Sequence, residues 1–164
     1  MKLIACIDKK RGIGKDNMPL FSIPEDLKFF KAKTLGKTVV MGRKTLDSLP
    51  GGRPLSGREN IVLSRDPGFF RDGVRVCRSI NELSSLSSDD VYVIGGGEIY
   101  RELLPFCDTA YITEVDAERD ADTFLPDLDP ADGWQLTDQS PDHEENGLRY
   151  RFMTYRRINQ NSAI

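Results

Sequence analysis

The chain has few of the residues that form disulfide frameworks and metal sites. It contains three cysteines and one histidine among 164 residues. Cys6, Cys77 and Cys107 are widely spaced without a C-x-x-C pair, and His143 stands alone. Neither a disulfide framework nor a zinc site is supported, because both need closely set groups of such side chains. We therefore expect no metal, and we expect Cys6 to be a small core residue.

Long apolar runs are also absent. No stretch approaches the roughly 18 apolar residues that a membrane-spanning helix needs. The apolar run from Met1 to Ile7 is soon broken by Asp8-Lys9-Lys10-Arg11 and is too short for a signal peptide. We therefore expect a cytoplasmic protein without a membrane partner. With 38% apolar and 30% charged residues, the composition predicts one ordinary domain over residues 1–158 and a flexible tail over 159–164.

An extended excess of positive charge is missing as well. Residues 37–78 hold nine Lys/Arg against four Asp/Glu, a balance of +5, whereas residues 79–145 hold two against eighteen, a balance of −16. The acidic second half argues against nucleic acid, which needs an extended basic surface. The compact basic segment suits a small polyanion such as a phosphorylated cofactor, although a solvated charged surface explains it equally well.

Short β-branched runs alternate with helix-like segments, which is typical of an α/β domain built on a sheet with crossover helices. We expect strands at residues 2–7, 37–42, 60–64, 74–77, 90–94, 110–115 and 148–156, the last two antiparallel. Helices are expected at residues 24–35, 43–49, 79–86 and 98–104. Segments 9–22 and 116–132 are expected to be loops, and residues 12–21 of the first form a candidate lid.

An acid stands at the start of the first expected helix. Pro24 suits the first helical position. Asp26 lies at the edge of an apolar face formed by Ile23, Leu27, Phe30 and Thr34. Desolvation there would raise the pKa of Asp26 and suit it to proton transfer. Taken alone, the local sequence favours a plainer role, in which Glu25 and Asp26 complement the positive helix N-terminus by a few tenths to about 1 kcal/mol.

Two strand-to-helix turns carry residues suited to phosphate. Gly95-Gly96-Gly97 lets a ligand approach the backbone closely, but it is not the full G-x-G-x-x-G fingerprint, because Tyr100 occupies the last position. A simple tight turn would need the same glycines. The second turn, Gly42-Arg43-Lys44-Thr45, brings cations and a hydroxyl to the start of a helix. No segment supplies a G-x-x-x-x-G-K-[ST] loop, which excludes an ATPase of that type.

Five motifs follow one another in a fixed order: IPEDLKFFK at residues 23–31, VVMGRKT at 39–45, RPLSGREN at 53–60, VIGGGEIY at 93–100 and DTFLP at 122–126. Together they resemble dihydrofolate reductase over Leu3 to about Arg156. The resemblance implies a single α/β domain with a mixed, mostly parallel eight-stranded sheet flanked by helices and an antiparallel C-terminal strand. It also implies a monomer that reduces 7,8-dihydrofolate to 5,6,7,8-tetrahydrofolate by hydride transfer from NADPH to C6.

The resemblance assigns three residues to catalysis and further residues to the substrate. Asp26 would hydrogen-bond the pterin 2-amino group and N3 and promote protonation at N5, Thr113 would support this acid, and Phe21 would stand at the lid. Arg58 would clamp the glutamate α-carboxylate, a role that suits a guanidinium fork. The remaining substrate-binding residues would be Ile4, Ala5, Leu27, Phe30, Leu49, Leu55 and Ile94.

The resemblance also places the cofactor between the lid and the two turns. Tyr100 would lie near the nicotinamide, and Arg43, Ser64 and Arg65 near the adenosine 2′-phosphate. The full set comprises Ala5, Ile13, Gly14, Asn17, Gly42, Arg43, Lys44, Thr45, Leu63, Ser64, Arg65, Gly95, Gly96, Gly97, Glu98, Ile99 and Tyr100.

Three features depart from the family pattern. One is the turn before Arg53-Pro54, which holds Pro50-Gly51-Gly52 and where loop length matters little. Phe21 occupies the lid position where members usually carry Trp, so the indole N–H that could hold a water is missing. Glu98 follows the three glycines where some relatives carry Arg, which removes one phosphate contact.

Two other functions fit parts of the pattern. A pyrimidine reductase of riboflavin synthesis would share the fold and cofactor but would not need the Arg58 clamp. A catalytically silent nucleotide-binding module would keep the glycines and the basic segment without needing Asp26. The chain carries both Arg58 and Asp26, which favours the dihydrofolate reductase reading.

Overall fold

A computed structural model describes residues 1–158, so the tail predicted for residues 159–164 lies outside the described residues. The main sheet comprises β1 (Lys2–Ile7), β4 (Thr38–Gly42), β5 (Glu59–Leu63), β6 (Val74–Cys77), β7 (Val91–Gly95), β8 (Thr109–Val115), β10 (Trp134–Gln139), β11 (His143–Glu145) and β12 (Leu148–Arg157). Within the described residues these form a nine-stranded sheet in the order β10-β12-β8-β1-β7-β4-β5-β6, with β11 also paired to β12.

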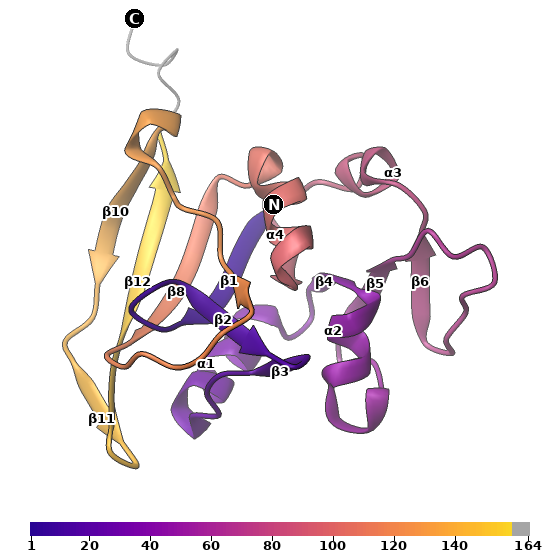
Figure 1. Cartoon of the computed structure of the whole chain (residues 1–164). Coiled ribbons are helices and arrows are strands. Elements are labelled where there is room, and N and C mark those ends of the chain that lie inside the picture. Colours follow the sequence, from indigo (N-terminus) through magenta and orange to yellow (C-terminus); the bar gives the residue numbers. More distant parts are fainter. Residues whose placement is uncertain (159–164) are drawn as a thin grey trace, which may run out of the picture.

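The strand directions confirm the predicted fold class. From β8 to β6 the neighbouring strands are parallel, whereas β12 runs antiparallel to β8. β10 and β11 both pair with β12 and share one edge, so the sheet is eight strand positions wide (Figure 1). The sequence did not predict β10 and β11, because apart from Trp134 their side chains are polar or exposed and show no clear alternation.

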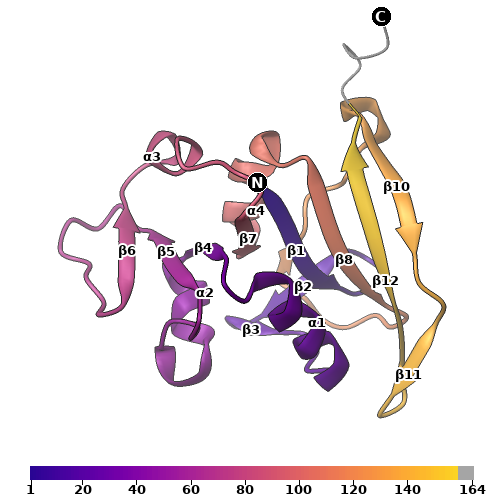
Figure 2. The same ribbon diagram turned by 180° about the vertical axis from the view of Figure 1, so that it is seen from behind.

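Helices cover both faces of the sheet because its central strands are apolar on both sides. Val39, Val40 and Met41 of β4 are fully buried, and consecutive residues pack into different clusters. One face packs against α3 (Ile80–Ser84) and α4 (Gly97–Leu103), and the other against α1 (Pro24–Thr34) and α2 (Arg43–Ser48). Figures 1 and 2 show the molecule from these opposite sides.

The prediction that residues 9–22 and 116–132 are irregular loops is wrong in part. β2 (Gly12–Lys15), β3 (Met18–Pro19) and β9 (Thr123–Phe124) form a small antiparallel sheet. Asp16 and Asn17 have positive φ and make the tight turn between β2 and β3, a conformation that Asp and Asn tolerate. These strands are too short to show a period of two, so the sequence could not reveal them. Short 3₁₀ turns occur at η1 (Pro50–Gly52), η2 (Leu104–Phe106) and η3 (Pro130–Asp132).

The first helix has the predicted bounds to within one residue, but its packed face differs. Ile23 and Thr34 are buried as expected, whereas Leu27 is 57% exposed. Phe29 packs instead, with its ring stacked on Phe152 at 4.5 Å between centroids.

No helix in residues 1–158 is long and apolar enough to cross a membrane. The same residues contain no group of His, Cys, Asp and Glu side chains that could hold a metal ion, and all three cysteines are free thiols.

Candidate active site

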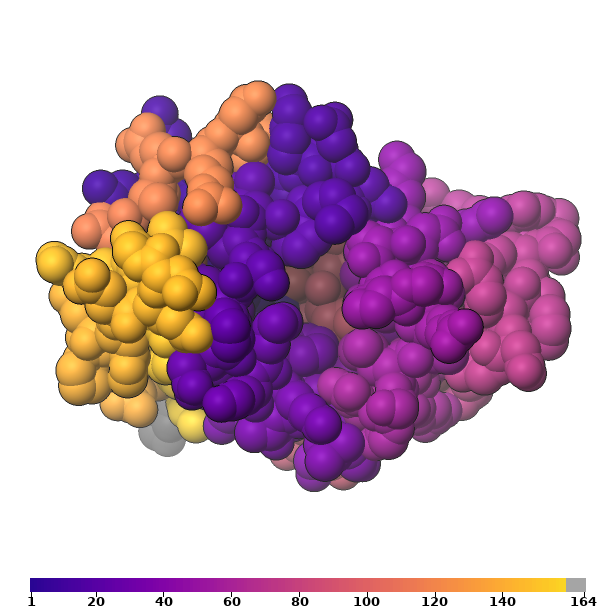
Figure 3. All heavy atoms as spheres, turned by 90° about the horizontal axis from the view of Figure 1, so that it is seen from below, coloured from indigo at the N-terminus to yellow at the C-terminus, as the bar shows by residue number. Residues whose placement is uncertain are grey.

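The two turns predicted to bind the cofactor lie at the carboxyl ends of β4 and β7, where α/β sheets commonly bind ligands. β1 leads into the lid, β4 into α2 and β7 into α4 at this edge. Figure 3 shows a hollow on this side of the molecule, between the indigo N-terminal segments and the magenta region of α2. Atoms in the colour of β7 and α4 are visible at its bottom.

Asp26 is fixed by a hydrogen bond from the sheet. It lies in the first turn of α1 and is partly buried, and the Thr113 hydroxyl on β8 donates to its Oδ1 atom at 2.5 Å. Thr113 is itself buried in the sheet. This contact holds the carboxyl in one orientation and leaves Oδ2 without a partner from Thr113.

The surroundings of Asp26 shift its proton affinity. Burial raises the pKa of Asp26 above its ordinary value, while hydrogen bonds from Thr113 and the Cys6 thiol partly oppose this rise. The direction is the one expected from the sequence. Burial, followed by the nearby Asp26 charge, also raises the pKa of the Cys6 thiol, which therefore stays protonated and available as a donor. Asp26 is thus a carboxyl whose proton is held more tightly than in water.

Sequence reasoning missed the contact between Cys6 and Asp26. We predicted Cys6 as a core residue, but it is only partly buried and lies level with Thr113 in the parallel pairing of β1 and β8. Side chains at paired positions of neighbouring strands lie on the same face, so Cys6 and Thr113 approach Asp26 together. Nothing in the local sequence of β1 indicates that β8 is its neighbour.

An apolar wall lies beside Asp26. One hydrophobic cluster on the α1 and α2 side of the sheet contains the predicted substrate residues Ile4, Phe30, Leu49, Leu55 and Ile94. Ala5 lies in the cluster on the opposite face, so its backbone and not its side chain is available to this side. Leu27, the remaining apolar residue of the predicted set, is exposed and outside both clusters.

Arg58 stands at the other end of α1. Its Nη1 donates to Thr34 Oγ1 at 3.1 Å, its Nε donates to the Ser56 carbonyl at 3.0 Å, and the guanidinium lies 6.0 Å from the centre of the Phe30 ring. Partial burial lowers the pKa of Arg58, and no acid opposes this effect. Arg58 is therefore a partly desolvated cation, fixed in place and without a carboxylate partner among the described residues.

The floor of the hollow is held by Tyr100. Its buried hydroxyl donates to the Ile4 carbonyl at 2.7 Å, which joins α4 to β1. Burial raises the pKa of Tyr100, so the phenol remains a donor. This contact fixes the position of the Ile4 carbonyl at the floor of the hollow.

The two glycine-containing turns meet at the strand ends. Met41 of β4 pairs with Gly95 of β7. A Cβ atom placed on Gly96 would lie 3.5 Å from Thr45 Oγ1, and one on Gly42 would lie 3.2 Å from Ile99 Cγ1. Backbone atoms of both turns and the Thr45 hydroxyl thus lie together. The helices that follow are short, so single N–H groups would contribute more to anion binding here than a macrodipole.

Gly97 has no room for a side chain. A Cβ atom there would lie 2.7 Å from Thr123 Cγ2 and 3.2 Å from the Phe124 carbonyl oxygen, so the turn is packed against β9. Two other residues of the predicted cofactor set, Leu63 and Ile99, belong to the hydrophobic core. Their backbone atoms alone can contribute to a ligand site.

The predicted phosphate-binding cations lie near this edge and are paired with acids. Arg43 Nη1 lies 3.4 Å from Asp66 Oδ2, and its guanidinium stacks over Phe69 at 4.6 Å. Arg65 Nη2 lies 3.6 Å from Glu102 Oε1. Lys44 and Glu98 are exposed, whereas Ser64 is buried and its hydroxyl accepts from the Asp66 N–H at 3.3 Å. Both guanidinium groups would have to share or exchange their partners to bind a phosphate.

Arg78 organises the loop that follows Ser64, a role that sequence reasoning missed. Its guanidinium donates to the carbonyl groups of Ser64, Asp66 and Phe69. These contacts fix the segment that carries Arg65 and the acid partner of Arg43. The basic character of residues 37–78 thus includes a cation with a structural role.

The lid residues lie on the small sheet and beside it. Ile13 and Gly14 are on β2 and Asn17 is in its turn, whereas Phe21 is 8% exposed and packs with Ile23. The Phe21 cluster also contains Cys6, next to Asp26. Phe21 is therefore placed on the lid side of the same acid.

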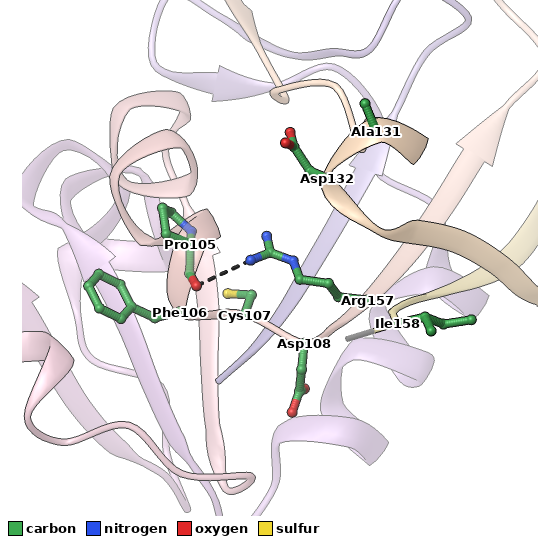
Figure 4. Close-up of a pocket in the computed structure, with 8 residues that line it drawn as sticks. All are labelled: Pro105, Phe106, Cys107, Asp108, Ala131, Asp132, Arg157 and Ile158. Atoms are coloured by element: carbon green, nitrogen blue, oxygen red, sulfur yellow. Dashed lines mark hydrogen bonds between the residues drawn. The ribbon is translucent and has the colours of Figure 1, made fainter. Parts of the chain in front are cut away.

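A second hollow lies at the opposite, amino ends of β1 and β8. It measures about 510 Å³ and is lined by residues 105–108, Ala131, Asp132, Arg157 and Ile158 (Figure 4). Arg157 Nη1 donates to the Pro105 carbonyl at 3.3 Å across it. None of the predicted site residues lines this hollow, so it is separate from the site around Asp26.

Comparison with known proteins identifies a family for this arrangement. The family model described as dihydrofolate reductase matches residues 1–157. The dihydrofolate reductase type 3 of Salmonella typhimurium is 42% identical over 161 residues, which cover 96% of this chain and 98% of the relative. The dihydrofolate reductase of Mycobacterium leprae (strain TN) is 44% identical over 151 residues, which cover 88% of this chain and 90% of the relative.

The fold also matches a solved structure. A dihydrofolate reductase from Enterococcus faecalis, complexed with NADP(H) and RAB-propyl, is 34% identical and superposes with a TM-score of 0.88. The match covers 96% of each chain, so it includes the sheet, the helices and the lid region together.

Proposed function

The chain belongs to the dihydrofolate reductase family, and on that premise we propose that it reduces 7,8-dihydrofolate to 5,6,7,8-tetrahydrofolate with NADPH. In this reaction a hydride is added to C6 of the pteridine and a proton to N5, so that one C=N bond becomes a C–N bond with N–H. The residues of this chain would bind and orient both molecules and control the proton.

The observation that carries the proposal is the spacing of two opposite charges along α1. Asp26 lies in the first turn, and Arg58 is held by Thr34 at the last residue of the helix. Eight residues of helix separate Asp26 from Thr34, which corresponds to roughly 12 Å of axial rise. The apolar wall of Phe30, Leu49 and Leu55 lies in the cluster beside this helix. The site therefore suits an elongated ligand with N–H donors at one end, aromatic rings between and a carboxylate at the other end.

At the pterin end we assign recognition to Asp26. Its carboxylate can accept two parallel hydrogen bonds, which suits the 2-amino group and N3 of a pterin ring. The Ile4 carbonyl is held by Tyr100, and Ile94 lies at the end of β7 on the same side. These fixed groups would set the ring plane before reaction, which lowers the entropy cost of reaching the reactive geometry.

At the other end we assign the glutamate α-carboxylate to Arg58. Its contacts with Thr34 and Ser56 use Nη1 and Nε, so Nη2 and the remaining N–H bonds can meet a ligand. Other arginines of residues 37–78, including Arg43, Arg65, Arg71 and Arg75, have an acid within 4.0 Å. A partly buried cation without such a partner is the group best prepared to bind a ligand's carboxylate.

The turns at β4 and β7 fit a phosphorylated dinucleotide. The backbone of Gly95, Gly96 and Gly97 is free of side chains, and the Thr45 hydroxyl lies next to Gly96. The guanidinium groups of Arg43 and Arg65 lie at the same edge. NADPH supplies the hydride when it is bound. The lid, with Ile13, Gly14 and Asn17, would cover the nicotinamide and exclude water, since closing segments serve this purpose in many enzymes.

The proton step is assigned to the surroundings of Asp26. Burial raises the pKa of Asp26, so the carboxyl holds its proton more readily than a free aspartate does, which suits it to promote protonation of N5. Phe21 brings no N–H donor to this region, whereas Thr113 and Cys6 both hydrogen-bond the carboxyl. We therefore propose that the sheet side, and not the lid side, fixes the proton-bearing group.

We also propose that the protein acts as a cytoplasmic monomer on small molecules and does not bind nucleic acid. The acidic balance of residues 79–145 supports the last point.

The proposed function is tested by mixing purified protein with NADPH and dihydrofolate and following the loss of reduced-cofactor absorbance. The account requires steady turnover and one tetrahydrofolate formed for each NADPH consumed. A parallel mixture with the pyrimidine substrate of riboflavin synthesis should show no turnover. Absence of dihydrofolate reduction, or reduction of the pyrimidine instead, would reject the assignment.

A further inference from the structure

One buried carboxylate joins the start of the lid to the loop that follows β8. Asp8 is 2% exposed at the end of β1. Its Oδ1 atom accepts from the N–H groups of Gly12 at 2.7 Å and Lys10 at 2.9 Å, and its Oδ2 atom accepts from the N–H of Arg119 at 3.1 Å. The backbone of Arg119 is therefore fixed relative to the entry of the lid.

The side chain of the same arginine contacts the other end of the lid. Arg119 Nη1 donates to the Leu20 carbonyl at 2.5 Å, and its guanidinium lies 4.5 Å from the centre of the Phe21 ring. Phe21 is 8% exposed and packs in the cluster that includes Cys6. Arg119 thus contacts the end of the candidate lid directly and is linked to its start through Asp8.

A planar cation suits these two contacts better than a point charge does. A guanidinium donates in its plane and stacks with its face, whereas an ammonium is a point charge that cannot lie flat on a ring. Phe21 has no polar atom of its own to fix its position, so stacking is the directional contact available to its ring. The acids on either side of Arg119 are paired elsewhere: Glu118 with Lys10 at 3.5 Å, and Asp120 with Lys15 at 3.2 Å.

We propose that Arg119 is a positioning residue, which holds Phe21 and the Leu20 peptide against the pterin side of the site and restrains opening of the lid. The inference rests on the proposed function, because it names what fixes one wall of the proposed site. Arg119 itself is exposed and touches neither Asp26 nor the cluster around Phe30, so its effect would pass through Phe21.

The first arm of the test uses the ligand-free protein and needs no activity. Amide hydrogen exchange is measured over residues 10–22 in the unaltered chain, Arg119→Met, Arg119→Lys and Glu118→Gln. Arg119→Met keeps an unbranched apolar stem but removes the donors and the charge, and Glu118→Gln removes only the neighbouring exposed ion pair. We expect exchange at residues 20–22 to be faster by about tenfold in Arg119→Met, intermediate in Arg119→Lys and unchanged in Glu118→Gln.

Three results of this arm would overturn the proposal. The first is exchange in Arg119→Met that equals that of the unaltered chain, and the second is exchange in Glu118→Gln that is as fast as in Arg119→Met. The third is faster exchange in Arg119→Met that extends to the buried amides of β8, which would indicate a general loss of stability.

The second arm measures single-turnover reduction and the KM for dihydrofolate. Arg119→Met should lower the single-turnover rate by about tenfold and change KM less, because a wall that is misplaced affects the reacting geometry more than binding. Arg119→Lys should recover part of the rate. Faster exchange with an unaltered rate would reject a role for Arg119 in the reaction. If the unaltered chain failed to reduce dihydrofolate, the proposed function would fail, while the exchange arm would still decide whether Arg119 fixes the lid.

Discussion

Oγ1 of Thr113 lies 2.5 Å from Oδ1 of Asp26, so a single hydrogen bond joins a central strand of the sheet to the first turn of α1. This contact orients a carboxyl that burial has made harder to ionise. It gives the site an acid with a fixed direction and a raised pKa, and several measurable consequences depend on it.

The first prediction concerns stability. Because the pKa of Asp26 is raised above its ordinary value of 3.8, the folded protein holds this proton more tightly than the unfolded chain. The resulting stabilisation is present in full below that ordinary value and is lost as the pH rises through the folded-state pKa. Burial penalises the charged form of Asp26, and Asp26→Asn removes that charge while keeping an acceptor for Thr113. We expect a higher Tm for Asp26→Asn at neutral pH and a shrinking difference in acid.

A matched control has the opposite sign. The pKa of Asp90 is lowered by its hydrogen bond from Lys37, so Asp90→Asn should reduce the Tm slightly at neutral pH. Thermal unfolding followed at several pH values compares the two variants. A lower Tm for Asp26→Asn at neutral pH would contradict the burial account.

The second prediction concerns Cys6. Its thiol hydrogen-bonds Asp26 and lowers the pKa of that carboxyl, so Cys6→Ala should raise the pKa of Asp26 further. The pH profile of single-turnover reduction should move to higher pH, and Cys6→Ser, which keeps a donor, should move it less. Cys107→Ala, at the opposite edge of the sheet, is the control. An identical profile in Cys6→Ala would show that Thr113 alone sets the acid.

The third prediction concerns the lid. Met18 and Pro19 are exposed on β3 and Leu20 is partly buried beside Phe21, so replacing Met18-Pro19-Leu20 by three glycines removes the partial burial of one apolar side chain. The loss of β3 pairing and of conformational restraint should slow turnover and speed release of NADPH, with only a small change in Tm. Stopped-flow release of the cofactor and thermal unfolding measure these quantities. A large fall in Tm would mean that the segment belongs to the folded core.

The fourth prediction concerns cofactor choice. Arg43 and Arg65 offer two cations to a 2′-phosphate, and Glu98 offers one opposing carboxylate. Hydrogen bonds to charged groups are worth about 1.5–3 kcal/mol each, and exposed ion pairs only about 0–1 kcal/mol. We expect a strong preference for NADPH over NADH, and the Arg43→Ala, Arg65→Ala variant should lose roughly two decades of NADPH affinity while NADH binding changes little.

Arg75→Ala provides the control for that variant, because Arg75 is an exposed cation of the same basic segment, placed on β6 beside Glu59. Its affinity for NADPH should match that of the unaltered chain. Equal use of NADH by the unaltered chain, or a preference that survives in the double variant, would mean that the 2′-phosphate is bound elsewhere.

Local sequence features predicted the parts of the fold that depend on near neighbours. Pro24 and the helical spacing after it located α1 and Asp26, and the apolar run at Val39–Met41 located a buried strand. The contact between Asp26 and Thr113 spans 87 residues, so it could be expected only from the family resemblance. Cys6, Arg78 and Arg119 were missed because their partners depend on which strands and loops become neighbours. The pairing of β2 with β9 depends in the same way on distant residues, whereas β2 and β3 form a local hairpin that is too short to show a period.

The central claim is that Asp26 promotes proton delivery during hydride transfer to dihydrofolate. Stopped-flow single turnover, run across a range of pH with NADPH and with NADPH deuterated at the transferred position, tests it most directly. The account predicts that the rate is slower with deuterated NADPH and that it falls as Asp26 ionises. In Asp26→Asn, the rate near neutral pH should be lower by a factor on the order of a hundred or more, while NADPH still binds. A rate in Asp26→Asn close to that of the unaltered chain would remove Asp26 from the mechanism.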